Sequence, residues 1–532
     1  MTNSPALVRR AIQAARALGL VLGLALAAAP AEAQPRKPKV AAPKKGKLKR
    51  PAIPPAPAKV APVKPAEAKE GAAPLALDLP VERHQLDNGL RVVIHVDRTS
   101  PTVAIAVVYD VGSRDEERGR SGFAHLFEHL MFQGSKNVLK GDHSRLISAH
   151  GGALDATTGA DRTSFSEVLP ASELALGLWL EADRMRSLDV NQESFDNQRK
   201  VVEEEHRRRV SSVAYQPSSL RLEELVYQGY WPYEHPTLGS TADLDGAKLD
   251  SLRDFHARHY GPNTAVLSIA GDVDAAEALL LVRKYFDGIP RIKAAPFVDA
   301  SLPEQTSQRT GVIKDDHART PGVLYGFAIP SARHPDHHAL QLAGIILGDG
   351  QSSRLHQLLV RDRALVQRVS AAASARRGPG LFRIDAVLTD GAKVAEVERI
   401  IEAEIKSLAT RGPSDAEVQK ARRRVEAGVV LGLQSNLARA RRLGEEELTS
   451  GDANQLRGEL GRYFAVKKAD IQRAVSEHLG PTRRTLIETV PTPREGGEAA
   501  PPAAAAKKAA APAPRSPKAA KKPAPRPRKK KP

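Results

Sequence analysis

Residues 122–133 form an almost wholly apolar stretch that nevertheless contains two histidines and a glutamate. Apolar side chains fall on nearly every side of a helix drawn through this stretch, which predicts a helix buried in the fold. A buried imidazole or carboxylate without a partner costs about 1–3 kcal/mol. His125, Glu128 and His129 therefore need a common partner, and this need restricts the fold more than any other feature of the chain.

A metal ion satisfies all three groups together. Residues four positions apart lie on one face of a helix, so His125 and His129 can direct both imidazoles at one ion. Glu128 lies at the edge of that face, where it can reach a water molecule without being a ligand. The spacing H-x-x-E-H is the inverse of H-E-x-x-H and is typical of zinc peptidases. Catalytic zinc takes three protein ligands and keeps one position open, so a third ligand is expected elsewhere.

The chain contains no cysteine, which excludes disulfides, thiolate metal sites and a cysteine nucleophile. Any metal site is therefore built from histidine and carboxylate side chains. The other histidines lack a comparable spacing on an apolar helix, and we expect them to lie at the surface; the ones considered are His143, His150, His334, His337 and His338.

Residues 1–33 have the order of a cleaved secretory signal. Three arginines precede the apolar run 17–29, and Ala31-Glu32-Ala33 provides the small residues of a cleavage site. A run of this length rises only about 20 Å as a helix, short of the ~30 Å core of a membrane. Export of a chain without cysteine fits a bacterial periplasm or exterior.

The two ends of the mature chain have a composition unlike the rest. Residues 34–77 and 492–532 are rich in Pro, Ala and Lys and carry eleven and twelve Lys/Arg, each against two acids. Such segments bury too little apolar surface to offset the entropy of ordering, so we expect a disordered linker and tail. The net charge of +18 lies in these segments, which argues against a nucleic-acid groove. The tails are either solvated or provide weak association with an anionic envelope or cell wall.

Strands and helices alternate between the tails, and their order partly recurs. We expect an α+β fold with a catalytic domain at 78–292, a Pro-containing linker at 293–308 and a second domain at 309–491, each with a largely antiparallel sheet covered by helices. The expected strands are a hairpin at 84–97 and segments at 103–109, 154–158, 163–169, 263–271, 323–329, 382–388 and 485–490. The expected helices are 122–133, 172–187, 193–213, 275–286, 337–347 and several within 393–479.

Over residues 80–490 the chain resembles the M16 zinc metallopeptidases, the family of pitrilysin and mitochondrial processing peptidase, in its short two-domain bacterial form. The resemblance rests on His125-Leu-Phe-Glu128-His129 and the preceding Gly122-Phe-Ala. It implies two tandem α/β sandwich domains of the LuxS/metallopeptidase type. It also implies one Zn²⁺ per chain, with Glu128 as the residue that activates the attacking water.

The family takes its third ligand from a later helix. Three consecutive glutamates, 203–205, stand at that place, and composition alone leaves the choice among them open. The family pattern selects Glu205, with 75 residues between it and His129. Many members carry another glutamate seven residues earlier, where this chain has Gln198. We expect this neutral amide to tune the site in a supporting role.

A second matching stretch runs from Gly151 to Phe165. In the family this strand is the edge of the sheet beside the zinc, and an extended peptide binds along it like an added strand. The resemblance implies substrate binding at Asp155, Ala156 and Thr157, mainly through the main chain. The family usually has Asn at position 155, and the alternative for this stretch is an ordinary hairpin.

The resemblance implies a secreted or periplasmic zinc endopeptidase for short or unfolded peptides. In the family an Arg/Tyr pair from the second half or from a partner stabilises the transition state; Arg383 and Tyr325 are candidates. The helix at 337–347 lacks H-x-x-E-H, a pattern similar to members that enclose peptides as homodimers or heterodimers. The alternative function is a non-catalytic peptide-binding or partner subunit of an M16 heterodimer.

Overall fold

The computed structural model describes residues 73–296 and 301–492, here called the first and second halves. The predicted signal peptide, nearly all of the predicted linker at 34–77 and nearly all of the C-terminal tail lie outside the described residues. Within the two halves, none of the helices has both the length and the apolarity needed to cross a bilayer.

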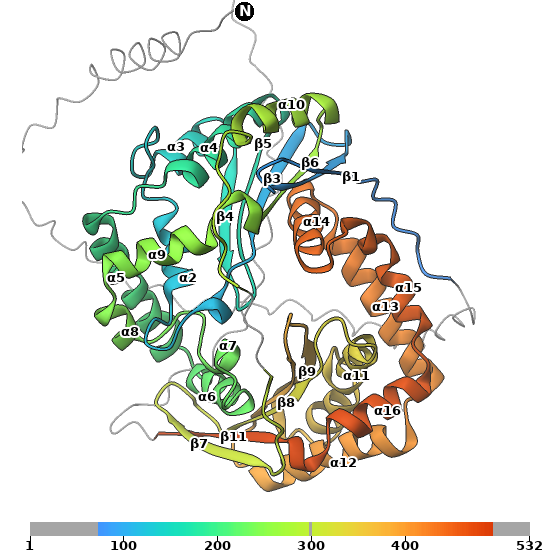
Figure 1. The fold of residues 1–532 in the computed structure, drawn as a ribbon. Coiled ribbons are helices and arrows are strands. Elements are labelled where there is room, and N and C mark those ends of the chain that lie inside the picture. Colours follow the sequence, from blue (N-terminus) through green and yellow to red (C-terminus); the bar gives the residue numbers. More distant parts are fainter. Residues whose placement is uncertain (1–72, 297–300, 493–532) are drawn as a thin grey trace, which may run out of the picture. The chain divides into compact units, whose positions relative to one another are not determined.

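The first half is built on a six-stranded sheet with the order β1-β2-β6-β3-β5-β4 (Figure 1). Its strands are β1 (Glu82–Gln85), β2 (Arg91–Val96), β3 (Thr102–Tyr109), β4 (Ala153–Thr158), β5 (Thr163–Pro170) and β6 (Ala265–Gly271). Neighbouring strands are antiparallel except for β2 and β6. Within the described residues β4 pairs only with β5, so it forms one edge of the sheet.

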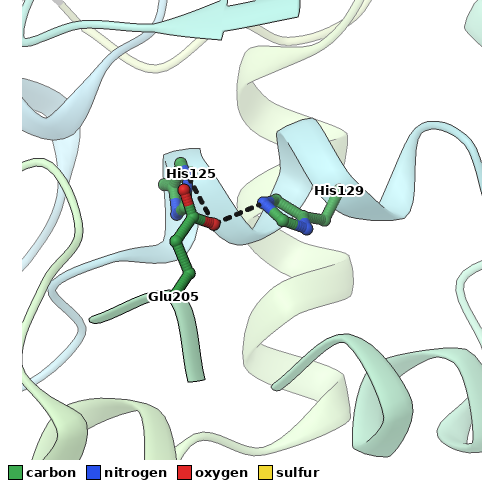
Figure 2. A group of neighbouring side chains, drawn as sticks. All are labelled: His125, His129 and Glu205. Atoms are coloured by element: carbon green, nitrogen blue, oxygen red, sulfur yellow. Dashed lines mark ion pairs between the residues drawn. The ribbon is translucent and has the colours of Figure 1, made fainter. Parts of the chain in front are cut away.

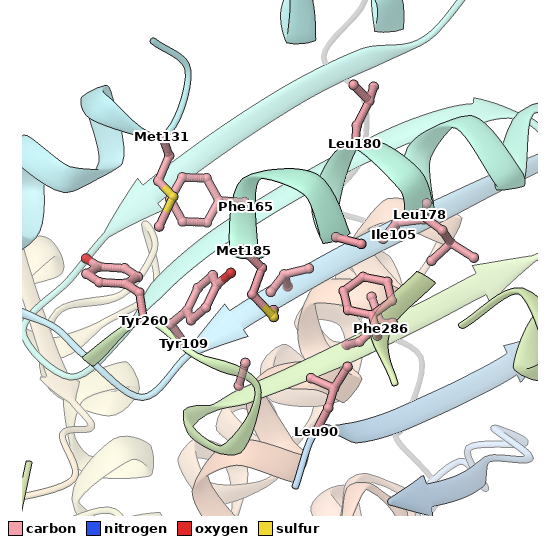
Figure 3. Close-up of a cluster of buried hydrophobic side chains, with 14 of the residues drawn as sticks. Leu90, Ile105, Tyr109, Met131, Phe165, Leu178, Leu180, Met185, Tyr260 and Phe286 are labelled. Carbon is pink, nitrogen blue, oxygen red and sulfur yellow. The ribbon is translucent and has the colours of Figure 1, made fainter. Parts of the chain in front are cut away.

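Helices of the first half lie on one face of this sheet and enclose the larger core. They are α2 (Phe123–Leu130), α3 (Asp142–Ala149), α4 (Leu174–Ser187), α5 (Gln192–His206), α8 (Thr241–Gly246), α9 (Leu249–His259) and α10 (Ala275–Phe286). The short helix α7 (Trp231–Glu234) instead places Tyr233 in a separate core that includes residues of the second sheet. Figure 3 shows Ile105 and Phe165 of the sheet beside Leu178 and Met185 of α4 and Phe286 of α10. Alternate side chains of the strands point into this core, because successive residues of a strand face opposite sides of the sheet.

The second half repeats the plan with five strands in the order β7-β11-β8-β10-β9. The strands are β7 (Arg309–Asp315), β8 (Gly322–Ile329), β9 (Val366–Ser374), β10 (Gly380–Leu388) and β11 (Thr485–Pro491). The helices are α11 (His337–Gly348), α12 (Val394–Arg411), α13 (Asp415–Gly432), α15 (Glu459–Ala465) and α16 (Lys468–His478). Both halves are thus largely antiparallel sheets covered by helices, and the α+β prediction is confirmed.

Each sheet receives a helix from the opposite half on its other face. Helix α14 (Asn436–Ser450) packs on β3 and β6, where Ala440 meets a layer of alanines from the first sheet. Helix α6 (Gln216–Val226) packs on β7, β8 and β11, where Leu222 and Val226 join a core with Ile487. The small alanine side chains let α14 approach the first sheet closely. Each of these two cores therefore contains residues from both halves.

The structure departs from the predicted elements in several places. The helix predicted at 193–213 ends at His206 and continues as a π-helical turn, Arg207–Ser211. Strands β7 and β9 and helices α3, α6, α7, α8 and α9 were not predicted. The two missed strands are the edges of the second sheet. In β7 exposed and covered positions alternate, but the residue types do not follow them, because Val312 is exposed and Arg309 is partly buried. In β9 the exposure itself is irregular, so neither strand shows a clean alternation of apolar and polar residues.

Candidate metal centre

Helix α2 is fixed at its start by a buried carboxylate. Gly122 precedes it with φ of 92°, and a Cβ there would lie 2.8 Å from the Leu238 carbonyl oxygen. The Glu116 carboxylate accepts hydrogen bonds from the backbone N–H groups of Gly122 and Ala124, both at 2.8 Å. It also lies 3.0 Å from His235 Nε2. A carboxylate at this end complements the partial positive charge of the helix N-terminus, so Glu116 holds the helix in place.

Helix α5 supplies the second part of the site. It begins at an Asn191 cap, whose side chain accepts the Ser194 N–H, and it packs against α2. Glu205 lies in its last turn, immediately before the π-helical turn Arg207–Ser211. Single π-helical turns occur frequently at functional sites, where they redirect a side chain.

The predicted ligands come together in the structure (Figure 2). Glu205 Oε2 lies 3.3 Å from His129 Nε2 and 3.7 Å from His125 Nε2. All three candidate ligand atoms lie within 4.8 Å of one another. Ligands held about 2.0–2.1 Å from a tetrahedral zinc ion lie roughly 3.4 Å apart. The donor types and their spacing therefore fit a single zinc ion, with His125, His129 and Glu205 as the residues that would hold it.

The protonation of His125 suits a metal site. Burial lowers the pKa of His125 to about 3, and the neighbouring His129 and Arg209 act in the same direction. His125 is therefore neutral at physiological pH. A neutral imidazole has a free lone pair, which is the form that binds a metal.

The structure distinguishes the three consecutive glutamates. Glu203 is partly exposed and lies 3.9 Å from Arg199 on the same helix. Glu204 is exposed and pairs with Arg207 and Arg208. The Glu205 side chain is only 13% exposed, against 45% for Glu204, and faces the imidazoles. Arg209 lies 2.8 Å from Glu205 Oε1, so it holds one carboxylate oxygen while Oε2 faces the histidines.

Gln198 is not a candidate ligand but contacts one of them, His129. Its Oε1 is 3.3 Å from His129 Nδ1, so the Nδ1–H can donate to it and leave Nε2 for a metal. Among the described residues the Nδ1 of His125 has no such partner. The amide therefore orients one of the two imidazoles.

Glu128 points from α2 towards the edge strand. The Thr158 hydroxyl at the end of β4 donates to Glu128 Oε2 at 2.5 Å. Burial raises the pKa of Glu128, and the Thr158 hydrogen bond and His129 oppose this rise. Sequence reasoning did not identify Thr158, although the alternation Leu154, Ala156, Thr158 along the strand would have placed it on the same face as α2.

The three predicted substrate residues lie on the edge strand β4, but the Asp155 side chain is turned from α2. Its carboxylate lies 2.7 Å from Arg441 Nη2 on α14, and Arg441 also donates to Ser166. Asp155 therefore lies on the sheet face that α14 covers. The part of β4 that is left to bind a peptide beside Glu128 is therefore the main chain of residues 155–157.

The candidates for the Arg/Tyr pair belong to the second sheet. Arg383 pairs with Asp385 and donates to Ser219, and Tyr325 is buried in the second core. Neither contacts the predicted ligands within the described residues.

The surface prediction is wrong for two of the other histidines. His143 and His337 are each 5% exposed, because His143 lies on the inner face of α3 and His337 starts the buried helix α11. His150 and His334 are exposed and His338 is partly buried.

His334 adjoins Asp336 and His478. Arg473 already pairs with Asp336 and, together with the His478 hydrogen bond, lowers the pKa of Asp336 to about 2.

His143 belongs to a second polar cluster, which is wholly buried. The candidate ligand atoms of His143, Glu167 and Glu181 lie within 4.8 Å of one another. Arg184 donates to both oxygens of Glu181, whereas neither oxygen of Glu167 meets a donor among the described residues. Because Arg184 already supplies a positive charge, a divalent ion would add a second one beside it. Burial and the neighbouring Glu181 raise the pKa of Glu167 well above its usual range, so Glu167 keeps a proton that it can donate to Glu181.

This proton makes stability depend on pH. Above the unfolded-state pKa of Glu, about 4.3, the folded chain holds one proton more than the unfolded chain, so the free energy of unfolding falls as pH rises. Glu167→Gln keeps a donor towards Glu181 and removes this dependence. We expect the variant to gain stability over the wild type by up to about 1.4 kcal/mol for each pH unit above this pKa, so the gain is larger at pH 9 than at pH 7 in urea unfolding.

The choice of a control variant depends on the titratable and charged groups that face Glu167. They are His143 from α3 and Glu181 and Arg184 from α4. Burial lowers the pKa of His143, so between pH 7 and pH 9 it stays neutral. Glu181→Gln leaves Arg184 without an anion and should lose stability at both pH values. A loss of stability in Glu167→Gln at both values would show that Glu167 is ionised.

Both halves of the chain match models of one protein family. Residues 91–232 match the family model described as insulinase (peptidase family M16), and residues 247–425 match the model of the peptidase M16 inactive domain. The chain belongs to the M16 peptidase family.

Relatives with assigned names agree with this placement. The chain is 28% identical to zinc protease PqqE of Helicobacter pylori over 405 residues, which is 76% of this chain and 91% of that protein. It is 30% identical to an uncharacterized zinc protease of Mycobacterium leprae over 377 residues, 69% of this chain and 82% of the relative.

Solved structures show the same fold. A protease from Helicobacter pylori superposes with a TM-score of 0.74 at 26% identity, over 78% of this chain and all of that one. A peptidase M16 inactive domain protein from Pseudomonas fluorescens gives 0.69 at 19% identity, over 78% of this chain and 98% of that one. At that lower identity the likeness shows the fold alone.

Proposed function

We propose that the chain is an exported, zinc-dependent endopeptidase that cleaves short or unfolded peptides. The observation that carries this proposal is the approach of His125, His129 and Glu205 to one point, with Glu128 beside them and hydrogen-bonded to the edge strand. Membership of a family with relatives named zinc proteases supports it. One ion per chain follows from the single H-x-x-E-H motif.

Each of these residues has a separate role in peptide hydrolysis. When bound, zinc supplies a Lewis acid that polarises the scissile carbonyl and makes water more acidic. Glu128 takes the proton of the attacking water and returns it to the leaving amine. The main chain of Asp155, Ala156 and Thr157 binds an extended peptide as an added strand. Gln198 and Arg209 keep the ligands in orientation.

Location, domains and partners belong to the same proposal. We assign residues 1–33 to a signal peptide and propose the periplasm, where the structurally similar PqqL of Escherichia coli is described as acting. We keep the domain boundaries at 78–292 and 309–491 with the linker 293–308 between them. The match of residues 247–425 to the M16 inactive-domain model supports a dimer, either of two copies or with a related chain. The basic tails provide at most weak envelope binding.

Metal removal tests the proposal. The purified mature chain, residues 34–532, should contain one zinc ion and cleave an unstructured peptide library. Treatment with 1,10-phenanthroline should abolish cleavage, and added Zn²⁺ should restore it, because the reaction needs the Lewis acid. Cleavage that persists in the metal-free protein would contradict the proposal.

One observation favours a second candidate, the non-catalytic partner subunit. Residues 247–425 match a domain described as inactive. This match concerns only the part of the chain without H-x-x-E-H, whereas a purely structural subunit has no need to keep His125, Glu128, His129 and Glu205. Zinc-loaded protein that binds peptides but never cuts them, alone or with a related chain, would establish this alternative.

A further inference from the structure

The last residue of the edge strand β4 makes a hydrogen bond to Glu128. Thr158 is its last residue, and its hydroxyl donates to Glu128 Oε2 at 2.5 Å. Within the described residues this is the one side-chain hydrogen bond that Glu128 makes. A hydroxyl bonded to a carboxylate makes a charge-assisted hydrogen bond, which is shorter and stronger than a neutral one. The orientation of Glu128 is therefore set from the strand and not from its own helix.

The strand geometry makes this contact directional. Leu154 and Ala156 pack against the core that contains α2, and Thr158 continues the same face two residues further on. Threonine is branched at Cβ, so its χ1 angle has few choices in a strand. Its hydroxyl is thereby fixed in direction.

The strand is also anchored on its opposite face. The Asp155 carboxylate and the Ser166 hydroxyl both bind Arg441 of α14. The same strand thus has one side chain tied to the second half and another tied to Glu128. Its unpaired edge is the part that the proposed function gives to the peptide.

We propose that Thr158 is a positioning residue that aligns Glu128 with a peptide bound along β4. This inference rests on the proposed function. A peptide that adds to the strand is placed in register with residues 155–157, and Thr158 places Glu128 relative to that same strand. Loss of the hydroxyl frees the carboxylate to rotate, and a displacement of about 1 Å at a reacting group can cost ~100-fold in rate.

The test compares Thr158→Val with Thr158→Ser in the zinc-loaded full mature chain. Valine keeps the shape and removes the donor, and serine keeps the donor. We expect Thr158→Val to lower kcat by about 10- to 100-fold with KM and zinc content unchanged, and Thr158→Ser to recover most of the loss. A structural role in the strand would instead raise KM and lower the thermal unfolding temperature in both variants, and that outcome would overturn the inference.

A second readout separates this inference from the proposed function. Crystal structures of the zinc-loaded wild type and Thr158→Val would show whether the Glu128 carboxylate changes orientation when the hydroxyl is lost. An unchanged carboxylate overturns the positioning role whether or not the wild type cuts peptides. A wild type that cuts no peptide but whose Glu128 rotates in the variant would overturn the proposed function and retain the positioning role.

Discussion

Replacement of Glu128 by glutamine is expected to lower kcat for peptide cleavage by about 10²- to 10⁴-fold, the range that a general acid–base group contributes. Glutamine keeps the size of the side chain and can still accept a hydrogen bond from Thr158, but it cannot take a proton from water. Initial rates on a quenched fluorescent peptide, with zinc content measured on the same samples, check this expectation.

Zinc content provides the control for this variant. Glu128 is not among the three proposed ligands, so the variant should keep one ion per chain and bind peptide with unchanged affinity. A loss of activity smaller than about tenfold would assign the proton transfer to another group.

Replacement of Glu205 by glutamine is expected to lower the affinity for zinc by more than about 100-fold, beyond the ~10–100-fold that outer partners of a metal site contribute. The reason is the position of Glu205 Oε2 beside both imidazoles. Competition with a fluorescent zinc chelator measures the affinity directly and needs no catalytic assay.

The neighbouring glutamate is a matched control. Glu204→Gln makes the same chemical change one residue earlier, on an exposed side chain paired with Arg207 and Arg208. Exposed ion pairs of this kind contribute little, so zinc affinity should stay within about twofold of the wild type. Equal losses in the two variants would remove Glu205 from the proposed ligand set.

Local pattern predicted the parts of the site that depend on one helix or one strand. The spacing of His125 and His129 on an apolar helix is a periodic signal, and the structure has that helix with both imidazoles on one side. Strands β4 and β5 were likewise predicted, at 154–158 and 163–169. Glu205 required the resemblance to the family, because composition gave three equivalent glutamates.

What the sequence could not indicate depends on contacts between distant segments. Thr158 holds Glu128 across 30 positions, and His235 contacts Glu116, the cap of α2, across 119 positions. His143 was misplaced because the segment 142–149 is mostly polar, and its inner face is recognisable only once the sheet is known. Long-range packing overrides local pattern at each of these positions.

Helix α6 of the first half covers the second sheet, and helix α14 of the second half covers the first, which affects how the chain unfolds. Neither half encloses its interior without a segment that the other contributes, so neither sheet has a complete hydrophobic partner when it is isolated. Cutting the polypeptide between the halves would leave two fragments that stay associated, and melting should proceed in a single transition.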